Sequence, residues 1–572
     1  MRYKKWEPGG FDRDTAVRFF RQGINPLISV FLASRGISTV EEARALLADD
    51  PAGINDPFLM TDMDKAVLRI KAAVRDGECV AIYGDYDVDG MTSCALLAHW
   101  LKSKGLDYEI YIPGRFGEGY GLNCPALDAL KARGADLVIT VDCCATAIAE
   151  AEYARSLGLG LVITDHHECK SEMPVADAVV NPKRPDCGYP HKTLAGVGVV
   201  FKLICAIEGE ARAEEMFRLY SDLVAIGTIA DVMPVVGENR ELIRRGLNMI
   251  RSNPRLGLSR LLRETQPENS RVTTATLGFV IAPRLNAAGR MGHTELAVNI
   301  LMTNDEAEAD KLSVELNRLN TERRALEGDI HDEATAMLQE CGTDGPIVLA
   351  KRGWYQGVAG IVAAKMAEHH LLPAIIISID EDGMGRGSCR SIGTFGIYSA
   401  LQSCEDILAD YGGHEMAAGV TISEKNIDEL RLRLKNCYCN KLGPSHEPGL
   451  RIDFEVEKPE LLTLANIKAL ALLEPFGYGN TQPILLITDA LLIGKTSIGG
   501  GKHTRFKIEK SGRLLDCTYF AMPADKLPLN DGMRVDVVFV PQVNEFRGRS
   551  SVQLNVMDIR AACGSDSCRG DY

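Results

Sequence analysis

The chain has 572 residues, 46% of them hydrophobic and 25% charged, which suits a globular protein of roughly three to four domains. No apolar run reaches the roughly 18 residues that span a bilayer, and no apolar segment follows the lysines of MRYKKWEPGG, so we expect a cytoplasmic protein without membrane association. The formal charge of −14 argues against a protein that coats nucleic acid by bulk electrostatics, but it leaves room for a local basic groove.

The sixteen cysteines are scattered along the chain, as expected of reduced thiols and not of a disulfide framework. Two local groups, Cys143-Cys144 and Cys437-Tyr438-Cys439, lack the spacing and the second ligand pair of a zinc site. We therefore expect no zinc centre.

Short apolar runs alternate with helical segments over residues 78–231, after an N-terminal segment, 1–70, that is expected to be helical. The runs VAIY, LVIT and LVIT are continuous and rich in Val and Ile, as in strands that are covered on both faces. The pattern predicts a doubly wound parallel α/β lobe, with bounds at 71–303, whose sites form at the carboxyl ends of the strands.

Five further parts are expected after this lobe. The predicted fold is α/β: two α/β lobes joined by a long helix, plus a C-terminal OB-type β-barrel of short alternating strands. The expected parts are a connecting helix over 304–340, a second α/β lobe over 341–440, a linker KLGPSHEPG, a barrel over 450–562 and a disordered tail over 563–572.

The densest chemical signal is GDYDVDG, which follows the first strand directly. Its aspartates, Asp85, Asp87 and Asp89, cannot all be buried without positive charge nearby, so a cation is the natural partner. An EF-hand calcium loop also begins with D-x-D-x-D-G, but here a strand precedes the motif and Leu96 stands where that loop needs Glu.

Acidic residues and histidines follow two more strands. Asp142 ends LVITVD, Asp165, His166 and His167 follow the next LVIT, and Asp231 ends the helical segment IGTIAD. Convergence on one site is the simplest interpretation. Carboxylates with imidazole favour manganese, magnesium, zinc or iron over calcium.

DYDVDG, the VD at Asp142, DHH and IADV resemble, in order and spacing, the four motifs of the DHH phosphoesterase family. The resemblance implies two Mn²⁺ or Mg²⁺ ions, with Asp142 between them, and hydrolysis without a covalent intermediate. The implied metal ligands are Asp87, Asp89, Asp142, His166 and Asp231. The other implied catalytic residues are Asp85 and Asp165, which support the ligands, and His167, which faces the scissile phosphate.

The rest of the chain resembles the RecJ family within the DHH phosphoesterases. The matching segments are IPGRFGEGYGLN, PRLNAAGR, GRGSCRSI and YGGHEMAAG, the last two in the second lobe, which resembles a DHHA1 domain. The implied substrate-binding residues are Arg115, Tyr120, Arg284, Asn286 and Arg290, with Ser388 and Arg390 around the 5′-phosphate and His414, also catalytic, at the phosphate that is cleaved.

The C-terminal part carries LEPFGYGN, Leu473 to Asn480, and then the barrel. OB barrels bind single strands by base stacking and a basic groove, for which the candidates here are Arg505, Lys507, Arg547 and Arg549. Phe506 and Phe546 fit either stacking or the barrel core, and we leave both open.

Three positions depart from the family pattern. Cys144 occupies a glycine position in the second motif, Tyr355 replaces the histidine of a Trp-His-x-Gly segment, and Tyr83 stands where some relatives have a metal-binding histidine. The last change removes one nitrogen ligand from the first metal and favours Mg²⁺ or weaker binding.

The resemblance implies a metal-dependent exonuclease that hydrolyses single-stranded DNA from the 5′ end to 5′-mononucleotides, in DNA repair and recombination. The alternatives are a phosphodiesterase for oligoribonucleotides or cyclic dinucleotides, and a non-catalytic nucleic-acid-binding scaffold, against which the intact acidic and histidine set argues. A single-strand-binding protein or a helicase is the candidate protein partner, and we expect a monomer.

Overall fold

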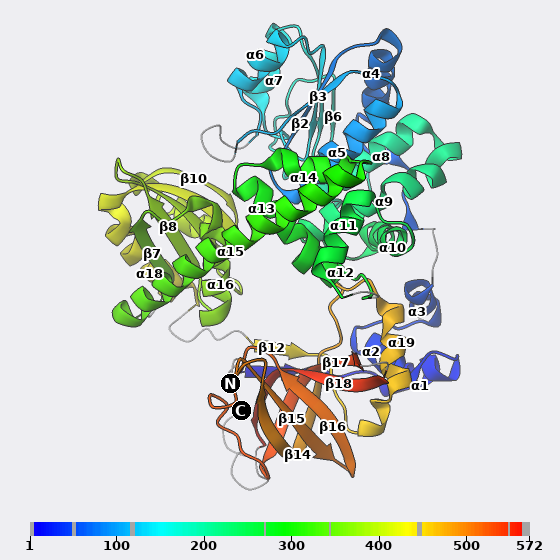
Figure 1. Ribbon diagram of the computed structural model, residues 1–572, viewed down its shortest axis with the longest axis vertical. Helices are drawn as coiled ribbons and strands as arrows, with labels where there is room; N and C mark the ends of the chain where they lie inside the picture. The colour runs from blue at the N-terminus through cyan, green and yellow to red at the C-terminus, as the bar shows by residue number, and fades with distance from the viewer. Residues whose placement is uncertain are drawn as a thin grey trace. The chain divides into compact units, whose positions relative to one another are not determined.

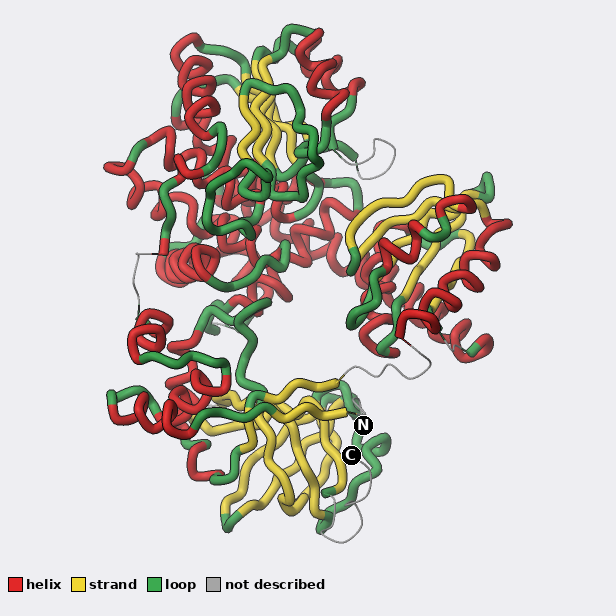
Figure 2. Tube along the Cα trace, turned by 180° about the vertical axis from the view of Figure 1, so that it is seen from behind, coloured by secondary structure: helices red, strands yellow, loops and turns green. Residues whose placement is uncertain are grey.

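The computed structural model describes residues 5–48, 53–114, 121–267, 270–342, 345–442, 449–546 and 549–562 (Figures 1 and 2). The chain folds into two compact units. One comprises Pro51–Lys441 with Gly477–Asn480, and the other comprises Met1–Asp50, Leu442–Phe476 and Thr481–Tyr572.

A five-stranded parallel sheet with helices on both sides forms the first lobe of the larger unit (Figure 2). Its order is β3-β2-β4-β5-β6, and every neighbouring pair is parallel. The strands are β2 (Val80–Gly84), β3 (Tyr108–Tyr111), β4 (Leu137–Val141), β5 (Gly160–Thr164) and β6 (Ala178–Val180). The doubly wound lobe predicted from the sequence is confirmed.

Both faces of this sheet are covered by helices, which explains the continuous apolar strands. Val80 and Ile82 of β2 point into one core, whereas Ala81 and Tyr83 point into another. The first core receives side chains from α4 (Met63–Asp76), α5 (Val88–Ser103), α8 (Gly196–Glu208) and α9 (Ala213–Ala230), and the second from α6 (Cys124–Ala132) and α7 (Ile148–Ser156).

A helical region follows and ends in the longest helix of the chain. It comprises α10 (Gly237–Ser252), α11 (Leu256–Thr265), α12 (Thr274–Thr276), a π-helix (Leu277–Ile281), α13 (Ala282–Arg290) and α14 (Thr294–Met302). Helix α15, Glu306–Cys341, has 36 residues and a length of about 54 Å at 1.5 Å per residue. It runs into the second lobe, as the sequence predicts (Figure 1).

The second lobe contains a five-stranded sheet of order β10-β11-β9-β8-β7, in which only β7 and β8 are parallel. The strands are β7 (Ile347–Arg352), β8 (Ala374–Ile379), β9 (Met384–Arg390), β10 (Leu408–His414) and β11 (Ala417–Ser423). Its helices are α16 (Gln356–His370), α17 (Ile397–Gln402) and α18 (Ile427–Leu442).

The other unit is a β-barrel with helices packed on it. Strands β13 (Phe454–Glu455), β14 (Leu485–Ile498), β15 (His503–Lys510), β16 (Arg513–Tyr519), β18 (Arg549–Ala561) and β17 (Arg534–Phe546) lie in this order, and β14 closes the barrel on β17. Its core includes Phe19 and Phe31 from the N-terminal helices α1 (Arg13–Arg21) and α2 (Pro26–Ser34). A third helix, α3 (Val40–Leu47), completes the N-terminal set.

Strand β1 (Lys5–Pro8) pairs in parallel with β12 (Gly449–Ile452). This pairing joins the N-terminal segment of the unit to the segment that follows the second lobe. The sequence predicted a helical segment over 1–70. The structure places α1 to α3 of that segment in the barrel unit and α4 in the larger unit.

Within the described ranges, no helix has the length and apolarity that a membrane crossing requires. The thirteen cysteines whose side chains the structure describes are all free thiols.

Candidate metal centre

The acidic loop after β2 is fixed by glycines at both of its ends. A Cβ at Gly84 would collide with the sulfur of Cys94, and one at Gly90 would collide with the backbone carbonyl of Asp85. Asp87 caps α5 by accepting a hydrogen bond from the Gly90 backbone N–H at 3.0 Å. The loop therefore folds tightly on itself and directs its carboxylates beyond the edge of the sheet.

Neighbouring strand ends bring the other predicted ligands to the same edge. The sheet order places β2 beside β4, where the connections diverge to either side, and this is where doubly wound folds form their sites. Three sets of side chains have ligand atoms within 4.8 Å of one another. They are Asp85–Asp87–Asp142, Asp89–His166–Asp231 and Asp142–His166–His167.

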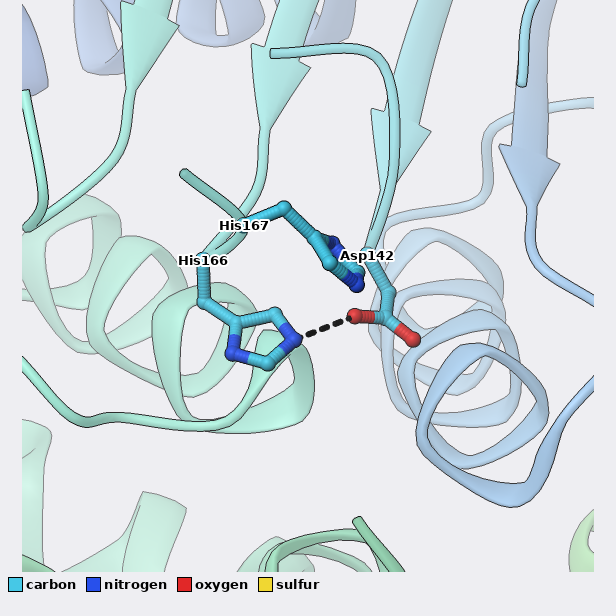
Figure 3. A group of neighbouring side chains, drawn as sticks. All are labelled: Asp142, His166 and His167. Atoms are coloured by element: carbon cyan, nitrogen blue, oxygen red, sulfur yellow. Dashed lines mark ion pairs between the residues drawn. The ribbon is translucent and has the colours of Figure 1, made fainter. Parts of the chain in front are cut away.

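The His166 ring points toward the Asp142 carboxylate (Figure 3), and two more carboxylates lie within 4 Å of its Nε2. Its Nε2 is 3.1 Å from Asp142 Oδ1, 3.5 Å from Asp231 Oδ2 and 3.8 Å from Asp89 Oδ2. Both ring nitrogens, Asp142 Oδ1 and Asp231 Oδ2 are buried and have no hydrogen-bond partner. Buried polar atoms without partners are costly, so this donor set fits divalent cations, with Asp142 common to two of the three sets.

The protonation behaviour of these groups agrees with a site that requires cations. Burial and the nearby charge of Asp87 raise the pKa of Asp89 to about 7. Burial and the neighbouring carboxylates raise the pKa values of Asp142 and Asp231 well above their usual range. Burial also lowers the pKa of His166 to about 3, which keeps its imidazole neutral, the form that binds metal.

The pKa of His167, the second histidine of the motif, is shifted in the opposite direction. Burial alone would lower its pKa, but the hydrogen bond and the charge of Asp165 raise the pKa of His167 to about 9. His167 Nδ1 is 2.8 Å from Asp165 Oδ1. Asp165 also accepts hydrogen bonds from the backbone N–H groups of His166 and Ala145, so it ties two of the motif loops together.

The start of α8 contacts the carboxylates, which the sequence did not reveal. The backbone N–H groups of Gly196 and Val197 donate to the two oxygens of Asp89, at 2.6 and 2.9 Å. A Cβ at Gly196 would lie 2.5 Å from Asp142 Oδ1, and one at Gly227 of α9 would lie 2.8 Å from Asp89 Oδ1. The only signal in the sequence was the glycine spacing of AGVG.

Tyr83 does not take the place of a metal ligand. Its buried ring stacks on Tyr111, with centroids 5.4 Å apart, on the sheet face covered by α6 and α7. Its hydroxyl donates to the carbonyl of Gly121 at 2.8 Å and accepts from the side-chain amide of Asn123 at 3.2 Å. Tyr83 therefore anchors the chain that leads into α6.

The other two departures from the family pattern have distinct settings. Cys144 has φ +81, a left-handed conformation that suits the glycine it replaces, and its sulfur is 3.1 Å from that of Cys143. Tyr355 donates its hydroxyl proton to the carbonyl of Arg290 at 2.7 Å.

The predicted substrate-binding residues of PRLNAAGR lie on α13. A Cβ at Gly289 would collide with the carbonyl of Tyr86, so this helix packs directly on the acidic loop. Arg284 donates to Asn317 and to the carbonyl of Val280, and Arg290 donates to the carbonyl of Gly357 at 2.8 Å. Asn286 is half-buried on the same helix. Arg115 and Tyr120 lie outside the described residues.

In the second lobe, Ser388, Arg390 and His414 share one face of the sheet. Arg390 of β9 is opposite Ala417 of β11, which in turn is opposite His414 of β10. Ser388 is two residues before Arg390 on β9 and therefore points to the same side. The structure brings these three predicted residues together.

On the barrel, Arg505 and Lys507 of β15 are exposed, and both lie near Asp516 Oδ1, at 3.4 and 3.7 Å. Phe506 between them is 1% exposed and packs in the barrel core. Stacking by Phe506 is therefore excluded. Arg549 is exposed, whereas Arg547 and the side chain of Phe546 lie outside the described residues.

Three stretches of the chain match known domain families. Residues 79–228 match the DHH family, N-terminal domain, residues 344–438 match the DHHA1 domain, and residues 452–558 match the RecJ OB domain.

Known proteins resemble almost the whole chain. The single-stranded-DNA-specific exonuclease RecJ of Bacillus subtilis is 40% identical over 97% of this chain and 70% of its own length. RecJ of Thermus thermophilus is 34% identical over 87% of this chain and 70% of its own length. The crystal structure of the Thermus RecJ in complex with Mn²⁺ matches with a TM-score of 0.82 at 28% identity, covering 98% of this chain and 80% of that one.

Proposed function

The chain belongs to the RecJ family, and from this premise we propose that it hydrolyses single-stranded DNA from the 5′ end to 5′-mononucleotides. One observation carries the proposal: buried and unpartnered atoms of Asp142, His166 and Asp231, which follow β4, β5 and α9, converge with the carboxylates of the loop after β2. Two divalent cations, Mn²⁺ or Mg²⁺, would satisfy these atoms, and when bound they would supply an activated water as nucleophile and neutralise charge on the phosphoryl oxygens.

The protein positions these cations and the phosphate. Asp87, Asp89, Asp142, His166 and Asp231 would hold the metals, and Asp142 belongs to two of the three groups of ligand atoms. Asp85 has an oxygen close to those of Asp87 and Asp142 and would support these two ligands.

His167 is the cationic group of the site. The hydrogen bond and the charge of Asp165 raise the pKa of His167 to about 9 in the metal-free site, and Asp165 holds the ring in place. In this position the ring faces the scissile phosphate and, when protonated, offsets the negative charge that develops on it.

The second lobe binds the end of the strand. Ser388 and Arg390 bind the 5′-phosphate and His414 contacts the phosphate that is cleaved, which their common sheet face supports. A guanidinium forms paired hydrogen bonds with phosphate oxygens, so Arg390 accounts for selection of a 5′-phosphorylated end. Arg284, Asn286 and Arg290 on α13, with Arg115 and Tyr120, contact the nucleotides behind it.

The barrel argues for a polymer over a small substrate. Arg505 and Lys507 follow the backbone of a long strand, whereas an oligoribonucleotide or cyclic dinucleotide needs no such surface. The RecJ OB domain match supports the same choice. A single-strand-binding protein or a helicase as partner, the monomeric state, the cytoplasmic location and the domain boundaries stay predictions.

Strands labelled at one end test the direction of cleavage. With Mn²⁺, the 5′ label should appear first as a mononucleotide, the 3′ label should appear last, and circular single strands should stay intact. Equal cleavage of circular and linear strands would refute the exonuclease. An RNA strand of the same sequence measures the preference for DNA.

A matched pair of variants tests the 5′-phosphate site. Arg390→Ala should raise the KM for a 5′-phosphorylated strand roughly 10- to 100-fold, since a hydrogen bond to a charged group contributes about 1.5–3 kcal/mol. The KM for a 5′-hydroxyl strand should stay nearly unchanged. Arg386→Ala removes the same charge from the same face of β9, four residues away, and should alter neither value. Equal effects of the two variants would contradict the assignment.

A further inference from the structure

A short turn far along the sequence packs on the loop that carries Asp231. Gly477–Asn480 belongs to the larger unit, whereas the residues up to Phe476 and from Thr481 belong to the barrel unit. The turn is closed by hydrogen bonds between the backbones of Gly477 and Asn480, at 2.9 and 3.1 Å.

The local backbone does not favour the position of Asp231. It caps the C-terminus of α9, where the helix dipole repels a carboxylate. Val232, the next residue, has φ +57, a left-handed conformation that β-branched side chains rarely adopt, and 63% of it is exposed. The backbone N–H groups of Val232 and Met233 donate to the carbonyls of Ile229 and Thr228, at 3.2 and 3.1 Å, and these bonds end α9 with Val232 in the left-handed conformation. Contacts further along the loop add to this cap and offset the strain of a β-branched residue there.

The turn Gly477–Asn480 contacts the loop at Val235, three residues beyond Val232. The backbone N–H of Val235 donates to the carbonyl of Tyr478 at 2.7 Å. Val235 is buried, and Gly477 approaches it so closely that a Cβ there would lie 2.5 Å from Val235 Cγ2 and 4.0 Å from Ile229 Cδ1. The turn therefore contacts Val235, which follows Asp231 in the chain, and approaches Ile229 of α9, which precedes it.

We infer that the turn Gly477–Asn480 is a positioning element for Asp231 and raises the metal affinity of the site. The inference rests on the proposed function, because it takes Asp231 as a metal ligand. It also changes how a truncation is interpreted: deleting residues 450–572 removes the turn together with the barrel, so lost activity in such a chain does not by itself report on strand binding.

Titration of the full-length metal-free protein with Mn²⁺, without DNA, tests the inference. Gly477→Ala should raise the Kd for Mn²⁺ roughly 10- to 100-fold, as is typical when a group that orients a metal ligand is disturbed. Val235→Ala removes the methyl group that the new Cβ would meet, so Gly477→Ala combined with Val235→Ala should recover most of the affinity. Excess Mn²⁺ should restore nuclease activity to Gly477→Ala.

Two control variants separate positioning from general damage. Tyr478→Ala keeps the backbone carbonyl and loses a side chain that is 65% exposed, and Gly328→Ala adds a methyl group in α15 where no atom lies within 4 Å. Both should bind Mn²⁺ like the wild type, and Tm values in EDTA check that every variant folds. The inference is overturned if Gly477→Ala binds Mn²⁺ within twofold of the wild type, or if the double variant recovers nothing. A wild type that binds no Mn²⁺ would instead refute the metal site itself.

Discussion

Gly196→Ala is a substitution whose effect on the metal centre follows from the geometry. The added Cβ would lie 2.5, 2.6 and 2.7 Å from Oδ1, Cβ and Cγ of Asp142. All three distances are shorter than real Cβ contacts, so either Asp142 or the start of α8 must shift. A shift of α8 also disturbs the two N–H groups that donate to Asp89.

The size of the effect can be worked out from these contacts. Overpacking of a closely packed site costs about 1–3 kcal/mol. If this cost falls on the carboxylate between the metals, it corresponds to a loss of roughly 10- to 100-fold in Mn²⁺ affinity. The turnover at saturating Mn²⁺ should also fall, because a misplaced metal no longer orients the nucleophile.

Isothermal titration with Mn²⁺ and a nuclease assay on 5′-labelled single strands measure the two effects. Gly198→Ala, two residues along the same helix, is the matched control, because its Cβ would meet only Leu194 at an ordinary 3.5 Å. The Gly198→Ala variant should keep its Mn²⁺ affinity. Its free energy of unfolding should rise by up to about 1 kcal/mol, because Ala is a better helix former than Gly. If Gly196→Ala and Gly198→Ala bind Mn²⁺ equally well, the contact between α8 and the carboxylates does not position the ligands.

Tyr83→Phe should lower the free energy of unfolding by about 1 kcal/mol, because the Tyr83 hydroxyl donates a hydrogen bond to the backbone carbonyl of Gly121. The Kd for Mn²⁺ should stay unchanged, and a higher Kd would show that the Tyr83 hydroxyl contributes to metal binding. Cys144→Gly should leave the free energy of unfolding in chemical denaturation within about 1 kcal/mol of the wild type, because relief of strain at φ +81 offsets the loss of a side chain buried in the core; a loss of about 3 kcal/mol would show that φ +81 costs nothing here. In EDTA, Tm should fall between pH 6.5 and 8.5. The pKa values in the folded state are about 7 for Asp89 and about 9 for His167, both above those in the unfolded chain, so the folded state binds protons that the unfolded chain has lost. The stability that these protons contribute disappears as the pH rises through those pKa values. Added Mn²⁺ should raise Tm more at pH 8.5 than at pH 6.5, and a uniform gain would count against the buried carboxylates as its ligands.

The convergence of the acidic and histidine side chains could be predicted because most of them directly follow strands. In a parallel sheet the carboxyl ends of neighbouring strands meet at one edge, so Asp85, Asp142 and His166 had to converge once β2, β4 and β5 were identified. The long helix and the barrel were predictable for a similar reason, since each has a local periodicity.

The contacts that hold the ligands could not be predicted in this way. The bond between Asp89 and the backbone of Gly196 joins residues 107 positions apart, and backbone donors leave no signature in the side chains. The same holds for the carbonyl of Tyr478 on Val235. Phe506 was ambiguous because alternation along a strand shows two faces without showing which one is the core, and the closed barrel resolved it.

The locations of the metals test the account most directly. Anomalous diffraction from crystals of the wild-type protein grown with Mn²⁺ should show two peaks about 3.5–4 Å apart, with Asp142 between them. One peak should lie by Asp85 and Asp87, and the other by Asp89, His166 and Asp231. A single peak, or peaks away from Asp142, would contradict the two-metal centre.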